Sequence, residues 1–201
     1  MYFIFLEQTS EGARELMTAI IEESTDNFIV RDNEKIVAMH SLKKGFIKEK
    51  PKQKQRLEDY GFLVGSGTFK HKRNNIIMTL LDASESNMFK NMEPPCKYFY
   101  GMLGAVHPKY HGKKVAEAVV IGLIKYCIDE GAKYYCGDNT NDKIANLFCK
   151  LPGFEIVDKF YYSDFKIHGT SVINQLVDGS KHTCLCFCDL EKHKNAYLKN
   201  V

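Results

Sequence analysis

The stretch GMLGAVHPKYHGKKVA, residues Gly101–Ala116, decides the fold of this chain. Its first part, Gly101–Val106, is a short apolar run with small residues, which predicts a buried strand. His107-Pro108 ends that strand, because proline has no N–H and biases the residue before it toward extended conformations. A short basic loop, Lys109–Lys114, comes next. The pattern predicts a strand and a loop that lead into a helix.

After this loop the apolar residues recur with the period of a helix, at Val115, Ala116, Val119, Val120, Leu123, Ile124, Cys127 and Ile128. A helix start carries partial positive charge and unpaired N–H groups, so the loop before it can cradle a pyrophosphate. Lys109, Lys113 and Lys114 would reinforce an anion there. An ordinary strand–turn–helix with solvated lysines accounts for the same residues, and this stretch alone does not separate the two interpretations.

The composition is that of an ordinary globular protein, with 201 residues, 44% hydrophobic and 26% charged. We expect one domain over residues 1–190 and a loose polar tail over Glu191–Val201. The net charge of +3 is too small to indicate a class of partner. No apolar run approaches the roughly 20 residues of a membrane span, so no membrane partner is expected.

The seven cysteines are an odd number without the spacing of a disulfide scaffold. We therefore expect reduced thiols and a cytoplasmic location. Cys184, Cys186 and Cys188 alternate along a predicted strand and would share one face of it. A zinc site would need a second ligand pair at recognisable spacing. Small buried hydrophobes are thus the preferred interpretation, and no metal is expected.

Lysines are concentrated in Lys43–Lys54. Nucleic-acid binding is one interpretation, but the segment carries no known binding motif. A solvated loop is preferred, so no nucleic-acid partner is expected. The remaining patterns predict strands at Tyr2–Leu6, Phe28–Arg31, Ile36–Ser41, Tyr98–Val106, Lys133–Gly137, Phe154–Phe165 and Thr183–Leu190, and helices over His71–Lys90 and from Asn139 or Thr140.

The segment VHPKYHGKKVAEAV, which begins at Val106, resembles the acetyl-CoA signature of the GNAT superfamily of N-acetyltransferases. His111 takes the first position of that signature, Lys114 its middle glycine and Ala116 its last small residue. Three more segments resemble the family in order and spacing, and the last resembles the invertebrate arylalkylamine (dopamine-type) branch. They are DNFIVRDNEKIVAMHSLKKG (Asp26–Gly45), DNTNDKIANLFCKLPGFEIV (Asp138–Val157) and KFYYSDFK…KHTCLCFCDL (Lys159–Leu190).

This resemblance implies an α/β fold with a mixed, mostly antiparallel sheet of about six to seven strands between helices. Two splayed parallel strands, Tyr98–Val106 and Lys133–Gly137, would form the acetyl-CoA cleft. The backbone of Gly104, Ala105 and Val106 would then hold the pantetheine. The pyrophosphate would bind to the loop residues His111, Gly112, Lys113, Lys114, Val115 and Ala116.

The resemblance also implies a reaction, in which a small primary amine of the arylalkylamine kind attacks the thioester directly. Glu22 or Glu23 would be the base, Thr140 would supply a hydroxyl, and His182 would serve as a proton relay. Solvated glutamates, a helix cap at Thr140 and a structural histidine are the simpler interpretations of the same residues. A monomer or weak dimer is expected.

Four departures from the family pattern favour a second class, a GNAT-fold protein that binds acyl-CoA weakly or not at all. Lys114 replaces a glycine, and Phe148 stands where many of these enzymes have an acidic tyrosine. Ile144 replaces a hydroxyl residue of the branch. The segment between the helix expected after Thr9 or Ser10 and the β-hairpin expected within Asp26–Gly45 is also shorter than in the branch. We prefer the enzyme, because a cofactor site made mostly of backbone tolerates changes of side chain.

Overall fold

The computed structural model describes residues 10–173, 175–176 and 178–198. The predicted strand Tyr2–Leu6 lies outside these residues. The elements in chain order are α1 (Ser10–Glu23), β1 (Asp26–Asp32), β2 (Lys35–Ile47), α2 (Gly61–Gly65), α3 (Lys72–Ser84), η1 (Glu85–Asn87), β3 (Cys96–Val106), η2 (Pro108–Tyr110), α4 (Val115–Asp129), β4 (Tyr134–Asn139), α5 (Asp142–Phe148), β5 (Phe154–Tyr161), η3 (Tyr162–Asp164), β6 (Lys166–Ile167), β7 (Thr170–Ser171), β8 (His182–Asp189) and α6 (Leu190–Leu198).

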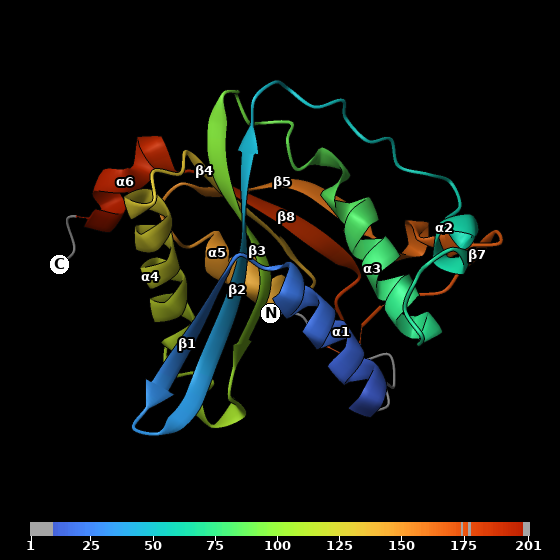
Figure 1. Ribbon diagram of the computed structural model, residues 1–201, viewed down its shortest axis with the longest axis horizontal. Helices are drawn as coiled ribbons and strands as arrows, with labels where there is room; N and C mark the ends of the chain where they lie inside the picture. Colours follow the sequence, from blue (N-terminus) through green and yellow to red (C-terminus); the bar gives the residue numbers. More distant parts are fainter. Residues whose placement is uncertain (1–9, 174, 177, 199–201) are drawn as a thin grey trace.

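A six-stranded mixed sheet runs through the middle of the molecule in the order β1-β2-β3-β4-β8-β5 (Figure 1). Within it β3 and β4 are parallel, and the other neighbouring strands are antiparallel. This confirms the predicted mixed, mostly antiparallel sheet with one parallel pair of central strands. The sheet separates α4, α5 and α6 from α1, α2 and α3 (Figure 1).

The first of these two layers is held by the apolar stripe of α4. Leu123 and Ile124 are buried against Phe99 of β3 and Tyr135 of β4. Cys184, Cys186 and Cys188 of β8 join the same core, while Phe187 packs on the opposite face of the sheet. The alternation predicted for the three cysteines is therefore confirmed, and they act as small buried hydrophobes.

On the other face, α1 and α3 pack together over β3. Leu16 and Ile20 of α1 meet Ile77 and Leu80 of α3 in one buried cluster that includes Leu103 of β3. A polar contact also connects the two helices, because the side-chain amide of Asn74 in α3 donates a hydrogen bond to the carbonyl of Gly12 in α1 at 2.9 Å. This hydrogen bond is why α3 buries an asparagine that an apolar stripe does not predict.

A β-bulge in β3 interrupts its pairing with β2. Ser41 of β2 pairs with Leu103 and Leu42 pairs with Gly101, so Met102 is the extra residue between them. An extra residue of this kind kinks its strand and increases the local twist. The bulge lies directly after the last position at which β3 pairs with β4, Gly101 opposite Gly137. It therefore marks the place where the two parallel strands begin to separate.

Several sequence predictions are wrong at element ends, and the strand expected over Phe154–Phe165 stops at Tyr161, before a 3-10 turn. The helix expected over His71–Lys90 stops at Ser84, and a 3-10 turn follows it. The tail expected to be loose forms α6 up to Leu198, with Tyr197 buried and its hydroxyl donating to the carbonyl of Pro152 at 2.6 Å. Leu190 and Tyr197 share one helical face seven residues apart, and so few apolar residues give a weak periodic signal.

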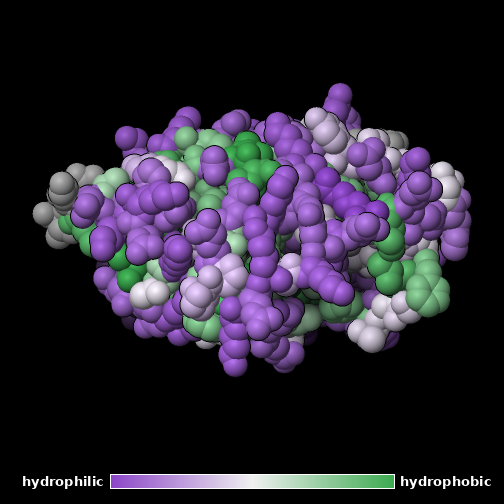
Figure 2. Space-filling model, turned by 90° about the horizontal axis from the view of Figure 1, so that it is seen from above, coloured by the Kyte–Doolittle hydropathy of each residue, from purple (hydrophilic) through white to green (hydrophobic). Residues whose placement is uncertain are grey.

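The lysine-rich stretch divides into two parts. Lys43 and Lys44 belong to β2, where they pair with Glu23 and Glu130. Residues 48–59 are exposed and carry no helix or strand, and they cross the top of the molecule in Figure 1. The same face, seen from above in Figure 2, is mostly hydrophilic. Within the described residues, no helix is both long and apolar enough to cross a lipid bilayer.

Candidate functional site

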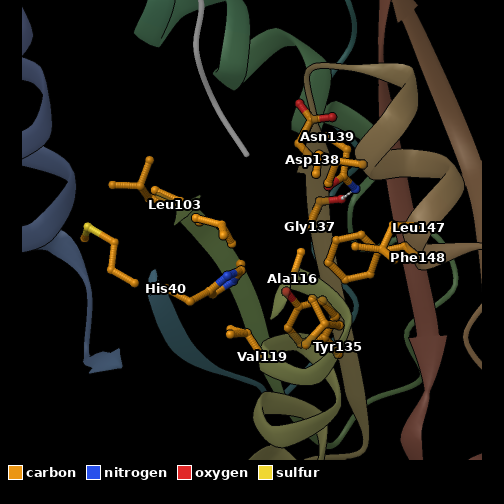
Figure 3. Close-up of a pocket in the computed structure, with 17 residues that line it drawn as sticks. His40, Leu103, Ala116, Val119, Tyr135, Gly137, Asp138, Asn139, Leu147 and Phe148 are labelled. Atoms are coloured by element: carbon orange, nitrogen blue, oxygen red, sulfur yellow. Dashed lines mark hydrogen bonds between the residues drawn. The ribbon is translucent and has the colours of Figure 1, made fainter. Parts of the chain in front are cut away.

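A cavity opens where β3 and β4 separate. Its volume is about 40 Å³, and we call it the inner cavity. Figure 3 shows His40 of β2 on one side of it and Gly137 of β4 and Phe148 of α5 on the other. Helix α4 borders the same space through Ala116, which lies between these two sides in the figure. The inner cavity thus lies in the mouth of the V formed by the two parallel strands.

A wider groove continues from the inner cavity toward the start of α4. Its volume is about 730 Å³, and we call it the outer groove. It shares Val106, Ala116, Ile144 and Leu147 with the inner cavity, so the two form one cleft. The outer groove lies between the loop before α4 and the first turn of α5, which contributes Lys143.

The outer groove ends on the N-terminus of α4. Lys114 is the N-cap residue, and its side chain makes no capping hydrogen bond. Its φ of 59° places it in the left-handed region, which glycine adopts most easily. The first N–H groups of a helix have no partner within the helix and carry partial positive charge. With Lys114 exposed beside them, they can attract an anion at this end of the cleft, while Glu117 and Asp178 also line the groove.

The predicted cofactor residues gather along this cleft, except one. Gly104, Ala105 and Val106 line the inner cavity. The outer groove is lined by His111, Gly112, Lys114, Val115 and Ala116. Lys113 borders neither space, and its ammonium lies 5.2 Å from the centre of the Tyr110 ring. The imidazole of His111 turns back to the end of β3, where its Nε2 lies 3.0 Å from the carbonyl oxygen of Val106.

Two glycines of β3 leave room for the inner cavity. A Cβ at Gly101 would overlap the hydroxyl of Tyr135, and a Cβ at Gly104 would lie 2.7 Å from Nδ1 of His40. Both approaches are closer than real Cβ contacts allow. The strand therefore tolerates no side chain at these two positions, because Tyr135 and His40 fill the space beside them.

His40 presents an unpaired nitrogen at this cavity. Its Nε2 is buried and has no hydrogen-bond partner within the described residues. Burial lowers the pKa of the imidazole to about 3, so the ring is neutral at physiological pH. A buried polar atom without a partner is costly, and a bound molecule that offers one would remove this penalty.

An aromatic pair forms the wall opposite His40. The ring of Tyr135 stacks on Phe148, with 6.0 Å between centroids and 20° between planes. Phe148 has no hydroxyl, whereas Tyr135 is fully buried with its hydroxyl beside Gly101 and Gly137. Burial raises the pKa of Tyr135 well above its ordinary value, so the phenol keeps its proton.

Asp138 of β4 is also among the residues that line the inner cavity, and its carboxyl group lies on the α3 side of the sheet, against Ser84. The hydroxyls of Ser84 and Thr183 donate to its two oxygens. Burial raises the pKa of Asp138 to about 6, against the opposing effect of these two hydrogen bonds. The cleft therefore holds one acidic group that titrates close to neutral pH.

Glu22 and Glu23 lie away from this cleft. Both side chains are exposed at the end of α1, and Glu23 pairs with Lys43. Neither residue borders the inner cavity or the outer groove. The reason is the short connection after α1, because the chain enters β1, the edge strand of the sheet, at Asp26. The structure therefore does not bring the base implied by the resemblance to the cavity.

Thr140 and His182 are close to the cleft but do not border it. Thr140 is buried, and its carbonyl accepts a 2.7 Å hydrogen bond from the hydroxyl of Tyr162. It does not cap α5, because the cap is Asn141, whose side chain accepts from the N–H of Ile144. This corrects the expected helix start at Asn139 or Thr140.

His182 lies at the start of β8, stacked on Tyr161 with 5.4 Å between ring centroids. Its Nδ1 is 3.4 Å from a carboxylate oxygen of Asp142. With Cys184 they bring three potential metal ligands within 4.8 Å of one another. Burial raises the pKa of Cys184 to about 11, however, and a protonated thiol is a poor ligand.

Sequence reasoning missed His40, Tyr135 and Asp138 as cleft residues. His40 directly follows the apolar run Ile36–Met39, and Asp138 follows the glycine that ends the β3–β4 pairing. Both are signals that a polar side chain is placed for function rather than for packing. Tyr135 gave no signal, because an aromatic residue in a buried strand is an ordinary core residue.

No protein-family model and no curated protein sequence matches this chain. Solved structures do. Arylalkylamine N-acetyltransferase 2 from Aedes aegypti superposes with a TM-score of 0.69 at 13% identity, over 87% of this chain and 79% of that one. A mosquito arylalkylamine N-acetyltransferase like 5b superposes with a TM-score of 0.63 at 17% identity, over 90% of this chain and 81% of that one. The polyamine N-acetyltransferase of Drosophila melanogaster superposes with a TM-score of 0.60 at 12% identity, over 90% of this chain and 82% of that one.

These similarities extend over most of both chains at low sequence identity. They agree with the mixed sheet, its single parallel pair and the strand–loop–helix that follows β3. The chain therefore has the fold of the GNAT N-acetyltransferases.

Proposed function

We propose that this protein is an acetyl-CoA-dependent N-acetyltransferase that acts on a small primary amine. The observation that carries this proposal is the continuous cleft, which runs from the gap between β3 and β4 to the N-terminus of α4. The proposal treats residues 1–190 as one N-acetyltransferase domain. It takes the substrate class from proteins of the same fold, whose names specify arylalkylamines and polyamines.

Within this proposal the cleft divides into two parts by chemistry. The outer groove, with the α4 N-terminus and Lys114, would hold the anionic diphosphate. The backbone of Gly104–Val106, which lines the inner cavity, would hold the amide-rich pantetheine, which needs hydrogen bonds to backbone groups. The unpaired Nε2 of His40 offers one further polar contact in the inner cavity.

The size of the inner cavity favours an acetyl group over longer acyl groups. One water-sized group needs about 10–15 Å³ of such space, so about 40 Å³ accommodates a group of a few heavy atoms. An acetyl group is of this size. Tyr135 and His40 line this cavity as well.

A second candidate function is acyl-CoA binding without turnover. The exposed positions of Glu22 and Glu23 favour it, because they leave the cleft without the base that the resemblance implies. The same cleft would then serve as a binding site alone.

Thermal unfolding with acetyl-CoA, followed by an amine panel, tests the two candidates. A ligand that binds the folded state stabilises it by about 2.7 kcal/mol at a hundredfold excess over Kd. Both candidates predict a saturable rise in Tm. Only the enzyme yields acetylated amine, which should be read by mass spectrometry because a thiol dye would also react with the exposed thiol of Cys149. No rise in Tm would contradict both.

A further inference from the structure

We propose that Asp138 is the catalytic base of this protein, the group that takes the proton from the incoming ammonium. The inference rests on the proposed acetyl transfer and assigns its missing proton acceptor. It also specifies the acetyl acceptor, which is an amine that arrives protonated and is attracted by a buried carboxylate.

Asp138 occupies the position where β4 leaves β3. The last pair of the parallel ladder is Gly101 opposite Gly137, and Asp138 is the next residue of β4. It borders the inner cavity, and only 2% of the residue is exposed. Figure 3 shows it beside Gly137, across the cavity from Leu103. The carboxyl group therefore lies beside the gap between β3 and β4, where one face of the sheet opens to the other.

The hydrogen bonds of Asp138 show on which face of the sheet its carboxyl group lies. Ser84 belongs to α3, on the opposite face of the sheet from α4. The outer groove lies on the α4 side. A thioester delivered along that groove would be approached from the α3 side by an amine beside Asp138. Acetyl donor and proton acceptor would then lie on opposite sides of the reacting carbon.

Two donors fix the carboxyl group in place. Ser84 donates to Oδ2 from α3, and Thr183 donates to Oδ1 from β8. Both hydroxyl residues are buried, at 2% and 1% exposure. These hydrogen bonds hold both carboxylate oxygens in one orientation. Donors of this kind also favour the ionised form, which is the form a base needs.

The surrounding charges set the strength of this base. Asp158 of β5 disfavours ionisation of Asp138, whereas Arg56 favours it. Glu85, after α3, and the buried Tyr162, Cys136 and Cys184 also face it. Burial outweighs the favourable contacts and raises the pKa of Asp138 to about 6. A base of this strength is ionised at neutral pH and accepts a proton far better than an ordinary aspartate.

The other candidates in the described structure suit this role less well. His40 borders the same cavity, but with its pKa lowered to about 3 it is a very weak base. Glu22 and Glu23 are exposed, and neither lines the cavity. Among the carboxylates of the described residues, Asp138 alone borders the inner cavity.

The proton balance of the reaction is complete with one base. Asp138 takes a proton from the ammonium, which frees the nitrogen lone pair. The C–N bond forms at the thioester carbonyl carbon and the C–S bond breaks. The remaining surplus proton on nitrogen goes to the departing thiolate, which leaves as the free thiol, and Asp138 returns its proton to solvent. The products are the acetamide, CoA thiol and one released proton.

The central test is Asp138→Asn with an amine that wild type acetylates. We expect kcat/KM at neutral pH to fall at least a hundredfold, within the range that one general base contributes. Activity of the variant should recover as the pH rises toward the pKa of the amine, because free amine then forms without the protein. Asp164→Asn, an exposed aspartate in η3, is the matched control and should keep full activity.

A second variant distinguishes a catalytic from a structural role. Thr183→Val removes a donor to Asp138, which should raise its pKa and move the acidic limb of the pH–rate profile to higher pH. If Asp138→Asn keeps wild-type activity and profile, or if Glu22→Gln or Glu23→Gln abolishes activity instead, the assignment is overturned.

Acetyl-CoA titration by calorimetry separates this inference from the proposed function. Asp138→Asn should bind acetyl-CoA with the wild-type Kd, since the base contacts the amine. If wild type binds acetyl-CoA and acetylates amines while Asp138→Asn does so equally well, only the base is wrong. If wild type itself does not bind acetyl-CoA, the proposed function fails, and the base assignment fails with it.

Discussion

The hydroxyl of Tyr135 occupies the space that a side chain at Gly101 would need. Gly101 is the last residue of β3 that pairs with β4, and Tyr135 lies two residues before its partner, Gly137. The two strands separate directly beyond this contact. A small residue on one strand and a tyrosine on the other therefore define the closed end of the cleft.

This contact predicts that Gly101→Ala is strongly destabilising and closes the inner cavity. The new methyl group would overlap the Tyr135 hydroxyl and lie 3.3 Å from Nε2 of His40. Overpacking of this kind costs about 1–3 kcal/mol. Thermal unfolding of the variant should show the loss, and acetyl-CoA should no longer raise its Tm.

The double variant Gly101→Ala/Tyr135→Phe should recover much of that loss, because the ring without its hydroxyl leaves 3.2 Å between the methyl and the nearest ring carbon. Tyr135→Phe alone is the control for removal of the hydroxyl. Equal destabilisation of single and double variants would show that the hydroxyl is not the conflicting atom.

Lys114→Gly should increase stability. Lys114 has a φ of 59°, and a residue with a Cβ in the left-handed region is strained by roughly 1–2 kcal/mol. Part of the gain is offset by the larger conformational freedom of glycine in the unfolded chain. A net gain of about 0.5–1 kcal/mol corresponds to a rise in Tm of roughly 1–4 °C at this chain length. Differential scanning calorimetry measures it.

Lys113→Gly is the matched control, because Lys113 is not among the residues with positive φ. It removes the same charge from the same loop without relieving strain, so it should not raise Tm. A Tm gain of equal size in both variants would mean that loss of charge, not backbone strain, is responsible.

The raised pKa of Glu85 predicts that the stability of the folded protein depends on pH. Burial raises its pKa from an ordinary 4.5 to about 8, even though Tyr100 donates a hydrogen bond to it. Between these two pH values the folded protein holds more protons than the unfolded chain, so the contribution is present at low pH and is lost as the pH rises through about 8. Glu85→Gln keeps the shape of the side chain and removes this ionisation.

The difference in Tm between Glu85→Gln and wild type should therefore grow in favour of the variant as the pH rises from 5 toward 8. A rise of a few degrees is expected, since about 1 kcal/mol corresponds to about 2–4 °C for a chain of this size. Glu58→Gln, at an exposed position, should show no such trend. A constant difference for Glu85→Gln at all pH values would contradict the raised pKa.

The sequence predicts the frame of this site because local patterns determine it. The strand before His107, the loop to Lys114 and the helical stripe after Val115 each follow from residue type and period, and all three are present. The same holds for the alternation of the three cysteines in β8. Each of these depends only on neighbours in the chain.

The side chains that meet at the cleft depend on register instead. His40 borders the cavity because β2 pairs it with Gly104, and the bulge at Met102 then changes the register before Leu42. Glu22 and Glu23 miss the cavity because α1 enters the edge strand after a two-residue connection. Asp138 is identified by donors 54 and 45 residues away in the chain, Ser84 and Thr183. No local pattern contains such pairings.

The most direct test of the account is calorimetric titration of acetyl-CoA into wild type, Ala116→Asp and Ala118→Asp. Ala116 borders both the inner cavity and the outer groove, whereas Ala118 is exposed on the same helix and borders neither. The two variants add the same charge two residues apart. We predict saturable binding to wild type and to Ala118→Asp and its loss in Ala116→Asp. Absence of binding to wild type, or equal binding to both variants, would contradict the assignment of this cleft to acetyl-CoA.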